Sequence, residues 1–151
     1  MDTIRGLNTK TAMEHLIFLT GQNIIEVCRA FGITPQQFSD WIKLRRPIPA
    51  DRLKQLAAHF GVPESALVED SRFARRISAL TAIELEQLVV VNRLKISATL
   101  EEQSEFSYRV RQLESERQRQ IRIARMAALL ETGDALTMSR VDAFLDDMEQ
   151  R

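Results

Sequence analysis

The chain has 151 residues, of which 44% are hydrophobic and 28% are charged, a balance typical of a soluble globular protein. The 21 basic and 21 acidic residues cancel, so the net charge by itself indicates no nucleic-acid partner. The only cysteine, Cys28, excludes an internal disulfide, and the two histidines, His15 and His59, lie far apart in the sequence. We therefore expect a reducing compartment, no metal site and no other cofactor.

The sequence contains no membrane or secretion signal. No stretch approaches the roughly 18 consecutive apolar residues of a membrane helix. The N-terminal residues also lack a basic start, an apolar core and a small-residue cleavage site, which together mark a secretory signal. These two features predict a cytoplasmic protein without a membrane partner.

Proline and glycine divide the chain into two unlike parts. All four prolines and four of the five glycines precede residue 64. Between Pro63 and Gly133 neither residue occurs, and this stretch is rich in residues that favour helix. We predict an all-α fold with one domain over residues 1–70 and a helical region over residues 71–151.

Start and stop signals predict five short helices in the first part, over residues 9–20, 23–32, 34–46, 49–60 and 63–68. Thr34 and Gln37 have the spacing of a capping box, with Pro35 at the first helical position, where proline is favoured. Asn23 and Glu26 repeat this spacing one helix earlier. The apolar residues recur at helical spacing, so these helices should pack into one small domain.

The second and third of these helices are joined by a short turn around Gly32, which is the spacing of a helix-turn-helix. In that motif the N-terminal part of the second helix enters the major groove of DNA. The amides of Gln36 and Gln37 suit adenine, and the hydroxyls of Thr34 and Ser39 suit bases or phosphate. Three cations follow, at Lys43, Arg45 and Arg46, where a loop would meet the phosphate backbone.

Residues 12–70 resemble the Cro and lambda-repressor class of five-helix domains, often called Xre-like. The resemblance is carried by EVCRAFGITPQQFSDW, followed by RRPIPADRLKQLAAHFGV. It implies groove-facing positions at Pro35, Gln36, Gln37, Ser39 and Asp40, and a loop at Lys43, Arg45 and Arg46 that contacts phosphate. Asp40 is an unusual residue for that place, because phosphate repels an acid unless it pairs with cytosine or with a nearby cation.

Several of these residues have a simpler interpretation. Gln36 and Gln37 are also ordinary polar residues at a helix start, and the arginines also suit a solvated loop. Phe38 and Trp41 suit base stacking, but their three-residue spacing favours the core. We expect them to be buried.

The stretch from Leu80 to Leu130 is long enough for one long helix or for two helices with a break. An interrupted coiled-coil seam follows alternating three- and four-residue steps through Leu85, Val89, Asn92, Ile96, Thr99, Gln103, Phe106, Val110 and Leu113. A second stripe at Val90, Val91, Leu94 and Leu100 suggests that residues 85–100 face two partners. Six arginines between Arg109 and Arg125 mark a solvated face, a second nucleic-acid contact or a partner for the acidic tail. A last helix is expected over residues 137–148.

These patterns predict a transcriptional regulator, a repressor or an activator, that binds double-stranded DNA at an inverted repeat. It would act as a homodimer held together through residues 80–151. No enzyme is indicated, because the sequence lacks a phosphate-cradling glycine loop, a nucleophile elbow and a cluster of metal ligands. Two alternatives remain open. One is an antitoxin or phage-type regulator, and the other is a protein-interaction module that does not bind DNA; in both, the C-terminal helices bind a second protein.

Overall fold

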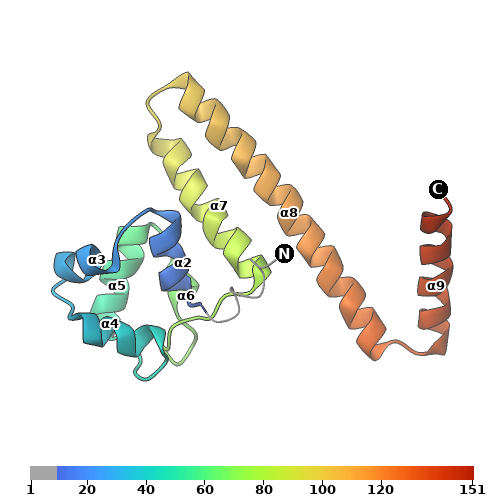
Figure 1. Cartoon of the computed structure of the whole chain (residues 1–151), viewed down its shortest axis with the longest axis horizontal. Coiled ribbons are helices and arrows are strands. Elements are labelled where there is room, and N and C mark those ends of the chain that lie inside the picture. Colours follow the sequence, from blue (N-terminus) through green and yellow to red (C-terminus); the bar gives the residue numbers. More distant parts are fainter. Residues whose placement is uncertain (1–9) are drawn as a thin grey trace. The chain divides into compact units, whose positions relative to one another are not determined.

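The computed structural model describes residues 10–151, and over these residues the chain is all-α, as the sequence predicts (Figure 1). The predicted start of the first helix at Thr9 lies outside the described residues. The helices are α2 (Ala12–Leu19), α3 (Ile24–Ala30), α4 (Pro35–Ile42), α5 (Ala50–Phe60), α6 (Glu64–Leu67), α7 (Ala79–Ile96), α8 (Leu100–Thr132) and α9 (Ala135–Glu149). Extended pairing over residues 10–151 is limited to two isolated bridges, Thr11 with Arg76 and Val68 with Ala74.

The chain divides into two compact units, an N-terminal unit (Met1–Arg117) and a C-terminal unit (Gln118–Arg151). The sequence-based division at residue 70 therefore differs from the division by contacts. The two divisions differ because α7 contributes to the core of the N-terminal unit. Leu16, Phe38 and Leu56 are buried in it, and Leu85 and Val89 of α7 belong to the same cluster. Residues beyond 70 thus complete a core that α2 to α6 share.

The five short helices occur where start and stop signals predict them, with shifted ends. Thr11 caps α2 and forms a capping box with Glu14. Gly61 ends α5 in the left-handed region, with a φ of 66°. The largest difference is at α4, which ends at Ile42 rather than just before Pro47. It ends early because Leu44 adopts a φ of 56°, which a continuing helix does not allow.

Residues 68–77 connect the small helices to α7. Val68 pairs with Ala74 in a tight reversal, and the returning segment then pairs with the start of α2. The backbone N–H of Ala12 donates to the carbonyl of Arg75 at 2.8 Å, and the N–H of Ile77 donates to Lys10 at 3.1 Å. These bonds hold the connection against α2, so that α7 begins beside it.

The predicted stretch 80–130 forms two helices. Residues 97–99 form a non-helical turn, after which α8 runs antiparallel to α7 (Figure 1). The turn interrupts the predicted seam, which therefore does not run along one helix. Arg109 pairs with Glu86 at 2.8 Å, and Arg117 pairs with Glu84 at 3.3 Å. Two of the six arginines therefore serve the contact between α7 and α8.

α7 buries residues on more than one face, but the predicted second stripe is buried only at Val90, while Leu100 lies beyond α7 and is 84% exposed. Val89 packs into the core shared with α2 to α6, while Val90 is buried outside that cluster, as is Leu113 of α8. Two polar side chains near its end bond to other helices. Asn92 donates to the carbonyl of Gly61 at 2.9 Å, and Arg93 donates to that of Leu19 at 3.0 Å. These carbonyls lie at the ends of α5 and α2, where helices leave acceptors unsatisfied.

The C-terminal unit consists of the last part of α8 and the whole of α9. The N-cap of α9 is Asp134. Val141 is the one buried residue that the structure shows in this unit. In residues 10–151, no helix has the length and apolar character needed to cross a membrane. The same residues contain no group of three or more His, Cys, Asp or Glu side chains placed to hold a metal ion.

Candidate nucleic-acid interface

α3 and α4 are joined by the short turn that contains Gly32, and buried side chains hold the two helices together. Val27 and Cys28 of α3 and Phe38 and Trp41 of α4 all enter the same core. Gly32 has a φ of 61°, which lets the chain reverse immediately after α3. Burial raises the pKa of the Cys28 thiol, which packs as a small apolar group. The core therefore fixes which face of α4 meets solvent.

The start of α4 is a capping box, as the sequence predicts. The hydroxyl of Thr34 accepts from the backbone N–H of Gln37 at 3.1 Å, and Oε1 of Gln37 accepts from the N–H of Thr34 at 3.0 Å. Both side chains are exposed but are already used in the cap. Gln37 retains both amide N–H groups as donors, and the cap occupies one of the two lone pairs of its oxygen.

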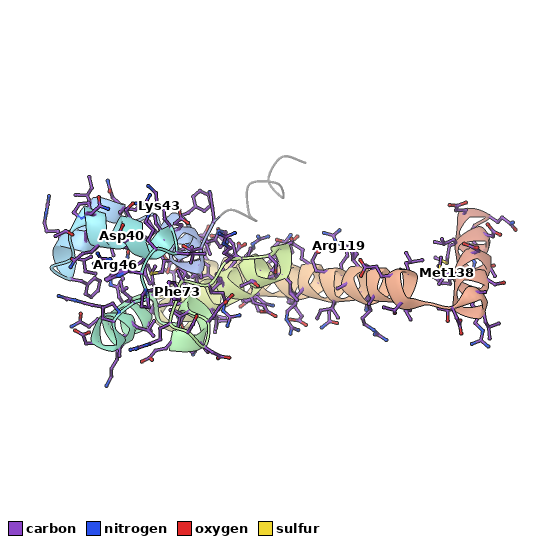
Figure 2. The ribbon with its side chains drawn as sticks, turned by 90° about the horizontal axis from the view of Figure 1, so that it is seen from below. Asp40, Lys43, Arg46, Phe73, Arg119 and Met138 are labelled. Atoms are coloured by element: carbon purple, nitrogen blue, oxygen red, sulfur yellow. The ribbon has the colours of Figure 1, made fainter. Side chains whose placement is uncertain are left out.

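Asp40 connects three of the predicted site residues. Its Oδ1 accepts from Nε2 of Gln36 at 3.0 Å. The same oxygen lies 3.6 Å from Nη1 of Arg45, and Oδ2 lies 3.9 Å from Nε of Arg46. Figure 2 shows Asp40, Lys43 and Arg46 in one region of the N-terminal unit. The Asp40 side chain is 17% exposed, whereas those of Arg45 and Arg46 are 60% and 77% exposed. The acid therefore lies at the base of a basic surface and not at its tip.

The turn after α4 is built by the backbone. The N–H of Arg45 donates to the carbonyl of Asp40 at 2.8 Å, and the N–H of Leu44 donates to that of Trp41 at 3.1 Å. This is a Schellman arrangement, which usually has glycine at the left-handed position. Here Leu44 occupies it and packs its side chain against the core. The ion pair between Asp40 and Arg45 joins two positions of the turn that commonly make an apolar contact.

Two contacts connect the region of α3 and α4 to residues distant in sequence, and local sequence patterns predict neither. Arg52 of α5 donates to the carbonyl of Phe31, at the end of α3, and to Oε1 of Gln55 at 3.2 Å. The carbonyl of Arg72 accepts from the N–H of Ile48 at 2.9 Å. Exposed Arg72 therefore lies close in space to the segment that follows the basic turn, residues 43–46. Sequence separations of about twenty residues conceal both contacts, because local patterns report only neighbours on the same helix.

The structure gives every predicted site residue a position. Six are exposed: Thr34, Gln36, Gln37, Lys43, Arg45 and Arg46. Ser39 and Asp40 are half-buried. Phe38 and Trp41 are buried with their ring centroids 6.5 Å apart, so the core interpretation of these two residues is confirmed. Amide side chains thus lie at the start of α4 and basic side chains in the turn after it, and Asp40 contacts both groups.

Comparisons of this chain with protein-family models, with curated proteins and with solved structures find no match.

Proposed function

We propose that the chain is a sequence-specific transcriptional regulator that binds double-stranded DNA as a homodimer. In this proposal α3 and α4 act as a helix-turn-helix, and α4 enters the major groove. The observation that carries it is the orientation of α4. Phe38 and Trp41 are buried, while Gln36 and Gln37 are exposed at the helix start and the basic turn follows at its end.

Gln36 is the residue that we propose reads a base. A glutamine recognises adenine through two bonds, one donated by its amide N–H and one accepted by its oxygen. In the free protein one N–H of Gln36 is bonded to Asp40. This bond leaves the second N–H and the oxygen available, and it restricts the rotation of the amide. Asp40 would thereby orient Gln36 before DNA arrives, which lowers the entropic cost of the base contact.

Lys43, Arg45 and Arg46 would bind phosphates. Guanidinium groups suit phosphate because they donate several bonds in one plane. Both arginines are more than half exposed, so they can reach a phosphate while Asp40 remains below them. Phosphate contacts give affinity and register without reading sequence. This division assigns sequence preference to the start of α4 and general affinity to the turn.

The test is selection from a pool of random duplexes at two salt concentrations, followed by sequencing of the retained DNA. We expect an enriched inverted repeat and a steep loss of binding with salt, because several condensed counterions are released. Arg45→Ala should weaken binding to all sequences alike, whereas Gln36→Ala should change the preferred sequence. Arg111→Ala is the matched control, since Arg111 is an exposed arginine of α8. Failure to retain any duplex at low salt would refute the proposal.

One observation favours a second candidate function, a module that binds another protein and not DNA. Asp40 pairs with both Arg45 and Arg46, and its negative charge weakens the positive field of this surface. An antitoxin or phage-type regulator would combine both activities, since it would bind DNA and also a second protein. Binding to duplex DNA that is insensitive to salt, or absent, would favour the protein-binding module.

A further inference from the structure

The C-terminal unit leaves most of its large apolar residues exposed. Its 34 residues form two helical segments, and Val141 is the one side chain among them that the structure shows as buried. A unit of this size rarely has a stable core unless another surface covers it. Its exposed large apolar residues are Ile123, Leu129, Leu130, Leu136, Phe144, Leu145 and Met148.

The apolar residues of α9 are arranged as a seam. Met138, Val141, Leu145 and Met148 follow three-, four- and three-residue steps, which place them along one side of the helix. Leu145 and Met148 remain 45% and 52% exposed. Asp142 and Glu149 follow Val141 and Met148 directly, at the flanking position of each heptad. Val141 is covered within the chain and Met138 is half-buried, so the part of this side that stays open is its end, at Leu145 and Met148, with an acidic border.

The end of α8 has the complementary surface. An open pocket there is lined by Arg122, Arg125, Met126 and Leu129, so its apolar base carries a basic border. Among residues 10–151, neither of these arginines has an acidic partner within 4.0 Å. The same holds for Asp142 and Glu149. The opposite charges are present in one chain and are not paired with each other there.

We propose that the C-terminal unit is the dimer interface and that its occupant is a second copy of this chain. The acidic, apolar side of α9 in one copy docks on the basic, apolar pocket of α8 in the other. A twofold axis repeats the contact, because each copy carries both surfaces. The charged borders fix the pairing, and the apolar residues provide most of the affinity. This inference rests on the homodimer of the proposed function and is independent of DNA binding.

A charge-exchange experiment on the full chain tests the interface. One variant is Arg122→Glu with Arg125→Glu, and the other is Asp142→Lys with Glu149→Lys. We expect each variant alone to dissociate about tenfold or more readily than wild type in sedimentation equilibrium, because like charges then face each other across the interface. An equimolar mixture of the two variants should form a heterodimer of near wild-type affinity, detected by native mass spectrometry. Restored affinity also shows that both variants are folded.

Lys95→Glu with Arg111→Glu is the matched control, because it makes the same charge change at two exposed residues outside the unit. It should dimerise as wild type does. Dimers unaffected by either exchange would overturn the interface while the proposed dimer stands. Dissociation that the mixture does not restore would show that the charges do not meet across two chains. A wild-type monomer at every concentration would overturn the homodimer as well, and DNA binding would still be decided by the duplex selection.

Discussion

Single residues in unusual backbone conformations shape the proposed interface and its support. Leu44 has a left-handed φ, which costs about 1 kcal/mol for a residue other than glycine, and its side chain packs on the core. Gly61 has a similar φ and accepts a bond from Asn92 through its carbonyl. At the first position packing retains a strained leucine, and at the second the backbone requires glycine.

Gly61→Ala should lower the free energy of unfolding by about 2 kcal/mol or more. Its Cβ would have an unfavourable φ and would lie 2.5 Å from Nδ2 of Asn92. Gly32→Ala is the matched control, because it has the same strain with nothing within 4 Å. Urea unfolding measures both variants. The excess cost of Gly61→Ala should largely disappear in an Asn92→Ala background, and an unchanged excess would refute the steric explanation.

Asp40→Asn should raise affinity for random-sequence duplex by roughly threefold, because Arg45 and Arg46 lose a neighbouring negative charge. Sequence preference should become weaker, since Gln36 keeps a bond partner but loses a charged one. Fluorescence anisotropy with selected and scrambled duplexes measures both effects. Lower affinity for both duplexes would show that Asp40 supports the fold of the turn more than it opposes phosphate.

At the scale of elements, caps and buried faces are what the sequence predicts well. The capping box at Thr34 and Gln37 and the burial of Phe38 and Trp41 agree with the structure, because each depends on residues within one helical turn. The sequence predicts too late an end for α4, because nothing in the local sequence indicates that Leu44 adopts a left-handed φ. The predicted coiled-coil seam spans the turn between α7 and α8, so it does not run along one helix. Asn92, one of its residues, donates to the carbonyl of Gly61.

Thr34→Ala should lower the free energy of unfolding by about 1 kcal/mol, because the N–H of Gln37 loses its acceptor. Thr34→Ser keeps the hydroxyl and should retain most of the stability. Chemical denaturation followed by circular dichroism distinguishes them. Equal losses for alanine and serine would indicate that the threonine methyl group, and not the cap, stabilises α4.

The packing of α2 on α7 should depend on pH through His15. Burial lowers the pKa of His15 below its ordinary value near 6.5, and nearby Lys10 adds to this effect while Glu86 opposes it. A lowered pKa means that the unfolded chain binds a proton more readily. The stability that neutral His15 contributes is thus fully present above pH 6.5 and is lost as the pH falls toward the folded-state pKa. His15→Gln should flatten urea midpoints between pH 8 and pH 5.5, and an unaltered slope would contradict this origin.

At the scale of the whole molecule, a net charge of zero conceals an uneven distribution. In the C-terminal unit, the end of α8 carries Arg119, Arg122 and Arg125 against one glutamate, whereas α9 carries four acids against Arg140. Neutrality therefore does not argue against charged surfaces. It is compatible with a DNA-binding surface in one unit and a reciprocal dimer contact in the other.

The two proposals together predict how dimerisation affects DNA binding. Arg122→Glu with Arg125→Glu should keep the base preference of α4 but bind an inverted repeat about tenfold more weakly, since each half-site is then bound separately. Wild type should require half-sites spaced by about 10 base pairs or a multiple. Gel shifts on one-site and two-site duplexes measure this. Equal loss on both duplexes would show that these arginines contact DNA directly.

The sequence by itself determined the all-helical class, the helix starts and the exposure of most candidate residues on α4. These depend on spacing, caps and turn residues that act over three or four positions. Only the tertiary structure decided which helices complete the core, so that α7 joined the unit assigned to residues 1–70. It also revealed the contacts of Arg52 with Phe31, Arg72 with Ile48 and Asn92 with Gly61. Such contacts bring together residues distant in sequence, and they form only because the packing of the whole core places the backbones within hydrogen-bond reach.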